Sequence, residues 1–101
     1  MEKVIRNGKV AVLVSRGFRT GWYTHHGIQE LLFHPKVVEM VEECKKQDIC
    51  KFVDEALNVE VSHYGAMGIV IHWLPVGEPF MIVQINDYEY VYTAENLDLV
   101  A

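Results

Sequence analysis

The sequence predicts an α+β fold with a mainly antiparallel sheet of four to five strands and two or three helices packed on one face. Three observations support this class. Residues 10–14 are a short β-branched run, residues 35–57 place apolar side chains at helical intervals, and the last forty residues alternate between strand-like and turn-like segments. The expected order is β-(α)-α-α-β-β-β-β. With 101 residues, half of them hydrophobic, the chain is expected to form one domain, residues 1–101.

The first strand is expected at residues 10–14, VAVLV, and its unbroken apolar character favours burial on both faces. Val4 and Ile5 precede Asn7 and Gly8, a dipeptide typical of two-residue hairpin turns. The start of the chain is therefore expected to pair briefly with the first strand. That strand is in turn expected beside residues 69–74 or 80–85.

The helices are expected between residues 28 and 57. Residues 28–33 have the apolar spacing of one helical turn, and Pro35 is suited to the first position of the helix that follows. Residues 35–47 form an amphipathic pattern with acidic residues before lysines, and residues 49–57 form a second, shorter one. Both apolar stripes are narrow enough to be covered by the sheet.

The remaining chain is expected to be antiparallel sheet. Residues 59–62 alternate like a half-exposed strand, residues 63–68 form a flexible turn, and strands follow at residues 69–74, 80–85 and 88–93. In the last strand Tyr88, Tyr90 and Tyr92 share one face. They either cover one side of an edge strand or form a platform for a ligand or partner, and together with Trp73 they favour a symmetric dimer.

A glycine-rich loop leaves the first strand and is the candidate binding site. Its arginines suit phosphate or carboxylate, its hydroxyls offer hydrogen bonds, and its aromatic rings could stack on a base. The predicted ligand-binding residues are Ser15, Arg16, Gly17, Arg19, Thr20, Gly21, Trp22, Tyr23, His25 and His26. The glycine spacing matches neither the dinucleotide fingerprint nor the phosphate-binding loop. The alternative is a tight turn in which Trp22 and Tyr23 fill the edge of the core and the arginines are solvated.

Charge is divided unevenly along the chain, whose formal net charge is −5. Residues 1–26 carry a formal charge of +4, and residues 27–101 carry −9. A basic loop on an acidic body suits a small anion or a partner of mixed charge, and it argues against binding to duplex nucleic acid.

Two cysteines and the apolar segments bear on compartment and cofactors. Cys44 and Cys50 are six residues apart, which is not a spacing typical of zinc sites, and no cofactor or metal is expected. The apolar runs are too short to span a membrane, and the N-terminal residues lack the apolar core of a signal peptide. A cytoplasmic protein with reduced thiols and no membrane partner is therefore expected.

Three segments together resemble small uncharacterised proteins of tailed bacteriophages: the strand VAVLVS, the residues Gly21-Trp22-Tyr23-Thr24, and residues 30–39, ELLFHPKVVE. The resemblance covers about the first forty residues and, more loosely, residues 73–80. It implies a context, since small acidic phage proteins often bind and disable a host enzyme, nuclease or nucleotide signal. It transfers no activity and no functional residue.

Three classes of function follow. The leading hypothesis is a non-enzymatic phage accessory or counter-defence protein that binds a host protein or a nucleotide-like anion through residues 15–26. The second is a small nucleotide-processing enzyme in which His25 or His26 acts as a general base near Ser15 or Thr24, with Glu30 as the carboxylate that would orient the ring, or a hydrolase that uses His63 or His72. The third is a structural homo-oligomer without a ligand. No catalytic residue is assigned.

Overall fold

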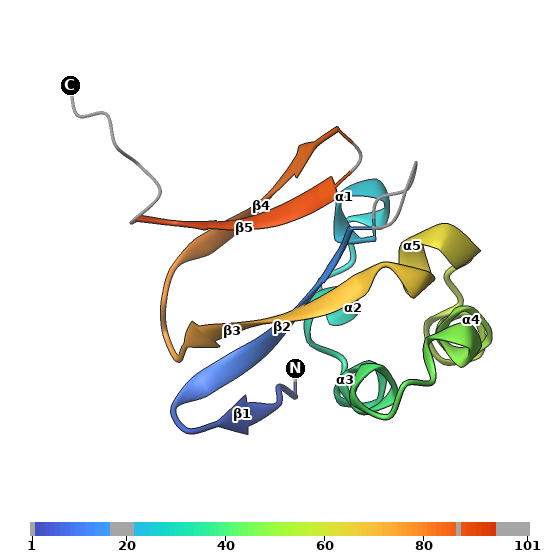
Figure 1. Ribbon diagram of the computed structural model, residues 1–101, viewed down its shortest axis with the longest axis horizontal. Coiled ribbons are helices and arrows are strands. Elements are labelled where there is room, and N and C mark those ends of the chain that lie inside the picture. Colours follow the sequence, from blue (N-terminus) through green and yellow to red (C-terminus); the bar gives the residue numbers. More distant parts are fainter. Residues whose placement is uncertain (1, 17–21, 87, 95–101) are drawn as a thin grey trace.

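The computed structural model describes residues 2–16, 22–86 and 88–94. The three-stranded sheet packs against the β4–β5 hairpin on one face and against the helices of residues 35–67 on the other, while residues 31–33 contribute side chains to both sides of the core (Figure 1). The elements are β1 (Ile5–Arg6), β2 (Lys9–Ser15), α1 (Tyr23–His26), α2 (Glu30–Phe33), α3 (Pro35–Glu42), η1 (Lys46–Asp48), α4 (Ile49–Leu57), α5 (His63–Met67), β3 (Ile69–Pro75), β4 (Phe80–Ile85) and β5 (Tyr88–Thr93).

The predicted α+β class with antiparallel strands is confirmed, but the strands form two sheets instead of one. The first has the order β1-β2-β3, and the second is the β4–β5 hairpin. Pro75 ends β3, and Gly77 has a positive φ of 83° in the turn that follows. The chain then packs the hairpin onto the face of the first sheet, where Phe80, Ile82 and Val91 contact its apolar side chains, instead of extending its edge.

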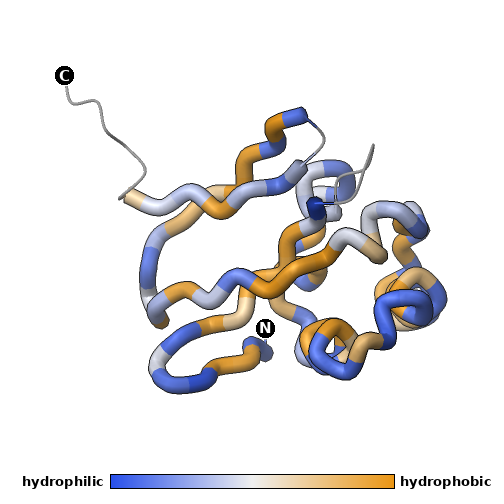
Figure 2. Tube along the Cα trace, viewed as in Figure 1, coloured by the Kyte–Doolittle hydropathy of each residue, from blue (hydrophilic) through white to orange (hydrophobic). Residues whose placement is uncertain are grey.

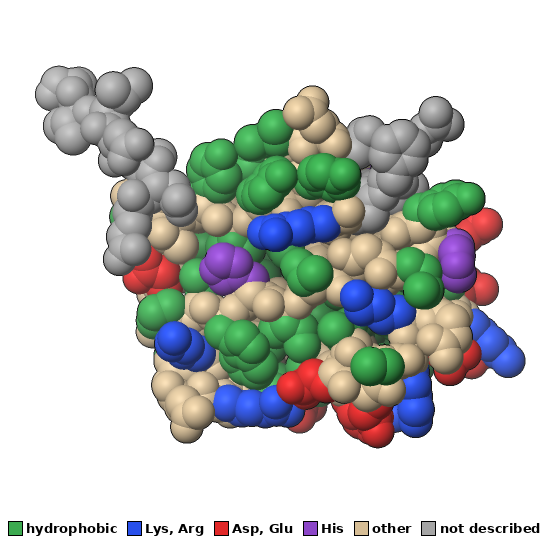
Figure 3. Space-filling view, in the orientation of Figure 1, with side chains coloured by type: hydrophobic (Ala, Val, Ile, Leu, Met, Phe, Trp, Pro, Cys, Tyr) green, Lys and Arg blue, Asp and Glu red, His purple; other side chains and the backbone are tan. Residues whose placement is uncertain are grey.

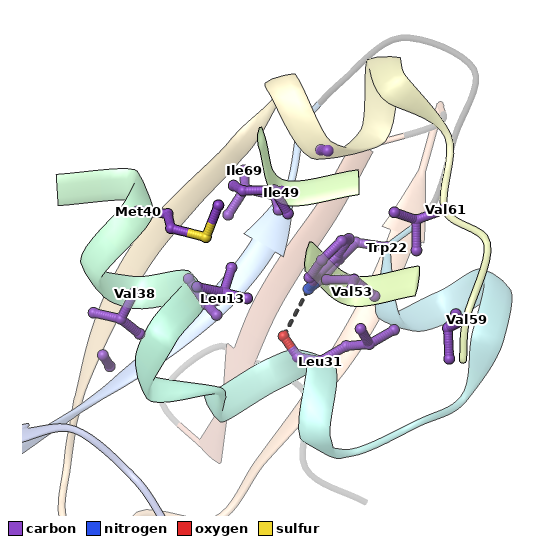
Figure 4. Close-up of a cluster of buried hydrophobic side chains, with 13 residues drawn as sticks. Leu13, Trp22, Leu31, Val38, Met40, Ile49, Val53, Val59, Val61 and Ile69 are labelled. Atoms are coloured by element: carbon purple, nitrogen blue, oxygen red, sulfur yellow. Dashed lines mark hydrogen bonds between the residues drawn. The ribbon is translucent and has the colours of Figure 1, made fainter. Parts of the chain in front are cut away.

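Strand β2 lies at the centre and is buried on both faces, as predicted. Ala11 and Leu13 face the helices, whereas Val10, Val12 and Val14 face the hairpin. Hydrophobic segments accordingly cross the middle of the molecule, while the turn between β1 and β2 is hydrophilic (Figure 2). The helical side of the core is completed by buried residues of α2, α3, α4 and the segment after α4 (Figure 4).

The neighbours of β2 also agree with the sequence. Asn7 and Gly8 have positive φ values of 52° and 74°, as the two central residues of a tight hairpin require. This turn pairs β1 with β2, and β2 pairs along its whole length with β3. The predicted placement beside residues 69–74 is therefore confirmed.

The helices differ from the prediction in number and in one boundary. The described residues contain five α-helices instead of two or three, most of them short. Helix α4 has the predicted bounds, but α3 ends at Glu42, and Cys44 takes a left-handed conformation with a φ of 59°. None of the helices in the described ranges is long and apolar enough to cross a membrane.

The predicted strand at residues 59–62 and the flexible turn after it are wrong. Val59 and Val61 are buried in the helical side of the core, outside any sheet. The next residues form helix α5, which begins where the Ser62 hydroxyl accepts the N–H of Tyr64 at 3.2 Å. The alternation of Val59 and Val61 therefore marks an extended segment whose two valine side chains point into the core, and it does not mark a β-strand.

Replacing Leu13 by alanine tests the central position of β2. Leu13 is fully buried, and the cavity left by its truncation is expected to lower the free energy of unfolding by about 2–5 kcal/mol. Urea unfolding followed by tryptophan fluorescence measures the change. The matched control is Glu55→Ala on the exposed side of α4, which should change stability by less than about 0.5 kcal/mol. Equal stability of the two variants would contradict this placement.

Candidate functional site

A buried carboxylate holds the base of the predicted binding loop. Glu89 of β5 is fully buried, and four donors converge on it. Its Oε1 accepts the N–H of Ser15 at 2.8 Å. Its Oε2 accepts the N–H of Trp22 at 2.8 Å, the N–H of Thr24 at 2.7 Å and the hydroxyl of Thr24 at 2.8 Å. A buried carboxylate is tolerated only with such partners.

Through these bonds Glu89 joins two segments that flank residues 17–21. Ser15 is the last residue of β2, while Trp22 and Thr24 belong to the start of α1. Two of the donors are backbone N–H groups at the beginning of α1, which have no partner within a helix. The carboxylate therefore fixes both ends of the loop to the hairpin and also caps the short helix.

Further bonds hold the same two ends. The Ser15 hydroxyl donates to the carbonyl of Gly65 at 2.7 Å, and the N–H of Arg16 donates to the carbonyl of Gly68 at 2.9 Å. Trp22 is fully buried, and its indole N–H donates to the carbonyl of Leu31 at 2.7 Å (Figure 4). Ser15 and Trp22, two of the predicted ligand-binding residues, are thus fully buried, and Trp22 fills the core as the alternative interpretation expected.

The other predicted site residues are distributed around these anchors. Arg16 is exposed, Tyr23 is partly buried, and His25 and His26 lie in α1 with their ring centroids 4.8 Å apart. The predicted ligand-binding residues Gly17, Arg19, Thr20 and Gly21 lie outside the described residues. The described part of the site is thus one exposed arginine next to a helix with two histidines.

Among the described residues, the buried carboxylate of Glu89 does not orient His25 or His26. The bonds of Glu89 go to Ser15, Trp22 and Thr24. Glu30 acts electrostatically on His34, although burial is the larger effect there and lowers the pKa of that imidazole. Burial, followed by the neighbouring His25, lowers the pKa of His26. Both effects favour the neutral ring.

Arg16 connects the loop to the hairpin. Its guanidinium carbon lies 5.1 Å from the ring centroid of Tyr90, within the range of a cation–π contact. The same arginine acts on His72 of β3, whose pKa is lowered first by burial and then by Arg16. The end of β2, the middle of β5 and β3 therefore meet at this side chain.

The outer face of the hairpin is apolar along its whole length. Three cross-strand pairs form it: Met81 with Tyr92, Val83 with Tyr90, and Ile85 with Tyr88. Met81, Ile85 and Tyr88 are 58%, 42% and 37% exposed. We call these six residues the tyrosine face. Hydrophobic side chains gather over β4 and β5 in Figure 3, with a basic side chain beside them.

Sequence reasoning found the tyrosines and missed Glu89. If Tyr88, Tyr90 and Tyr92 point outward, strand alternation requires Glu89 to point inward, and the structure places it there. The alternation was therefore sufficient to identify a carboxylate directed at the core. Its partners could not be identified from sequence, because they lie 65–74 residues away.

Comparison of the chain with protein-family models, with curated proteins and with solved structures finds no match. Within the described ranges, no three histidine, cysteine or acidic side chains are arranged to hold a metal ion. Cys44 is exposed and Cys50 is partly buried, and both are free thiols. The function is therefore argued from the loop anchors, Arg16 and the tyrosine face.

Replacing Glu89 by glutamine tests the anchor. The amide cannot accept all four hydrogen bonds, and the free energy of unfolding is expected to fall by about 2–4 kcal/mol. The amide resonances of Ser15, Trp22 and Thr24 should shift most in NMR spectra. The control Glu60→Gln replaces an exposed carboxylate and should leave stability and these resonances unchanged. Shifts spread evenly over the protein would contradict the anchoring role.

Replacing Arg16 by glutamine tests the contact with His72. Loss of the nearby positive charge should raise the pKa of His72 toward its ordinary value of 6.5. In the wild type the lowered pKa favours the neutral imidazole on folding. The contribution of the neutral His72 imidazole to the free energy of unfolding is therefore complete above about pH 6.5, and it is lost as the pH falls below that value. Imidazole NMR resonances recorded against pH measure the shift, with Lys45→Gln as a remote control that should not change it.

Proposed function

We propose that the protein is a non-enzymatic binding protein that engages a partner protein through the tyrosine face and Arg16. The observation that carries this proposal is the apolar outer face of the hairpin, whose six outward side chains include no charged residue. A hairpin with one face on the core ordinarily presents polar residues on the other. Here the acidic residue Glu89 points inward and the outward positions are aromatic or aliphatic.

The composition of this face is that of a protein interface. Tyrosine, methionine and arginine are enriched in the buried centres of interfaces, and tyrosine and arginine often contribute most of the binding energy. Tyr88, Tyr90 and Tyr92 supply large surfaces with few rotatable bonds, and Arg16 supplies a fixed donor fork at their edge.

The chemistry of the partner follows from the same residues. It should present an apolar patch for the tyrosine face and, beside it, a carboxylate for the guanidinium of Arg16. The resemblance to phage proteins suggests that this partner is a protein of the bacterial host.

A second copy of the chain is the less favoured occupant. The face of two six-residue strands measures about 20 Å by 10 Å, which is an area of about 200 Å². A stable dimer buries about 800 Å² on each partner. A symmetric contact of two tyrosine faces also provides no carboxylate within the face for Arg16. A partner that reaches beyond the hairpin satisfies both requirements.

A small nucleotide-like anion is the second candidate. The observation that favours it is the guanidinium of Arg16, whose positive charge lies 5.1 Å from the ring centroid of Tyr90. Such a ligand would depend on Arg16 and would not depend on Met81 or Ile85.

Photo-cross-linking in bacterial cells tests the proposal. Full-length protein carries p-benzoylphenylalanine in place of Met81 or Ile85, and in place of Glu55 on the exposed side of α4 as the matched control. We expect a cross-linked product with one host protein from both hairpin positions and none from the control. With that protein purified, Arg16→Glu should weaken binding at least about tenfold, and reversing the charge of the partner's carboxylate should restore it.

Three outcomes would overturn the proposal. Products of twice the chain mass would indicate the homodimer. Equal products from the hairpin and control positions would indicate non-specific contact. Binding of ATP or another nucleotide that is lost in Arg16→Glu but retained in Met81→Ser would favour the small-anion alternative.

A further inference from the structure

A hollow of about 290 Å³ lies on the side of the hairpin where β4 meets α2. Its volume is just below the range of about 300–1,000 Å³ that is typical of small-molecule sites, which limits it to a small ligand. The lining side chains include Lys3, Tyr23, Gln29, Phe33, Phe80 and Ile82. They come from the start of the chain, from α1 and α2 with the segment between them, and from β4.

The apolar part of the hollow is preformed. Phe33 is buried and Phe80 is partly buried, and their rings meet edge to face with centroids 6.2 Å apart. Ile82 extends the same surface along β4. A flat or short aliphatic group placed here would lie against the two rings and Ile82 without moving the backbone.

The polar part of the hollow consists of groups that donate hydrogen bonds. The ammonium of Lys3 lies 4.6 Å from the ring centroid of Phe33, so the charge is directly beside the apolar surface. Tyr23 adds a hydroxyl and Gln29 adds an amide. Among the described residues, no aspartate or glutamate lines this hollow. A group with negative charge is therefore the complementary one.

We propose that this hollow binds a small carboxylate with an apolar body, whose ring or short chain lies against Phe33 and Phe80 and whose carboxylate pairs with Lys3. A neighbouring hollow of about 180 Å³ shares these three residues but is also lined by Glu78. The carboxylate of Glu78 would repel the anionic head there, which directs the head to the side of Tyr23 and Gln29. The ligand is thus limited to the size of the larger hollow.

This site is separate from the surface that binds the proposed partner protein. It depends on Lys3 and the phenylalanines, whereas partner binding depends on Arg16 and the outward side chains of the hairpin. Met81 alone among the tyrosine face borders the hollow. Variants of Lys3 consequently test the ligand site without altering the tyrosine face.

NMR titration of the full chain with a matched pair of probes tests the proposal. The probes are 3-phenylpropanoate and its neutral analogue 3-phenylpropan-1-ol, added to protein labelled at leucine, valine and isoleucine methyl groups. We expect the methyl resonances of Leu32 and Ile82, both at the hollow, to shift with the acid. The alcohol should bind about three- to tenfold more weakly, because it lacks the charge that pairs with Lys3.

Two variants separate charge from shape. Lys3 is exposed, so Lys3→Gln should fold normally and should bind acid and alcohol equally weakly. Lys36→Gln, at an exposed lysine that pairs with Glu39 on α3, should retain the preference for the acid. Absence of shifts at millimolar acid, equal binding of the two probes to the wild type, or loss of the preference in Lys36→Gln would each overturn the proposal.

Discussion

The arrangement of this protein depends on the carboxylate of Glu89. It is the only charged side chain that is fully buried among the described residues, and it connects β5 with the end of β2 and the start of α1. A charge withdrawn from water must be matched by donors, and each of the four donors found here comes from the segments that flank the loop. The requirement to satisfy one charge therefore also determines where the end of β2, the start of α1 and the hairpin lie relative to one another.

The hairpin gains its exposed tyrosines by the same constraint. Strand alternation leaves two faces, and one of them must carry Glu89 into the interior. Tyr88, Tyr90 and Tyr92 then point outward, against Ile85, Val83 and Met81 of the neighbouring strand. The alternation of side chains over residues 88–92 of β5 thus directs Glu89 into the core and the three tyrosines to the outer face.

Local sequence patterns were sufficient to predict the bounds of several helices and strands, but they were insufficient to predict how these elements pack together. Helix α4 and strands β4 and β5 have their predicted bounds, because their periodicities and turn residues act over a few positions. The division into two sheets depends on whether the hairpin packs on a face or joins an edge, which contacts distant in sequence decide. For the same reason the alternative in which Trp22 fills the edge of the core could be stated from the sequence, whereas the hydrogen bonds that join Ser15 and Trp22 to Glu89 could not.

The separation of Glu89 from its partners has a consequence during synthesis. Glu89 lies 65–74 positions after Ser15, Trp22 and Thr24 along the chain. It therefore leaves the ribosome long after the three residues that it binds. Contacts of such sequence separation form late and carry a high entropic cost of closure. The end of β2 and the start of α1 are therefore synthesised well before the carboxylate that joins them to β5. A nascent chain that ends before β5 therefore lacks both Glu89 and the three tyrosines that flank it in the strand.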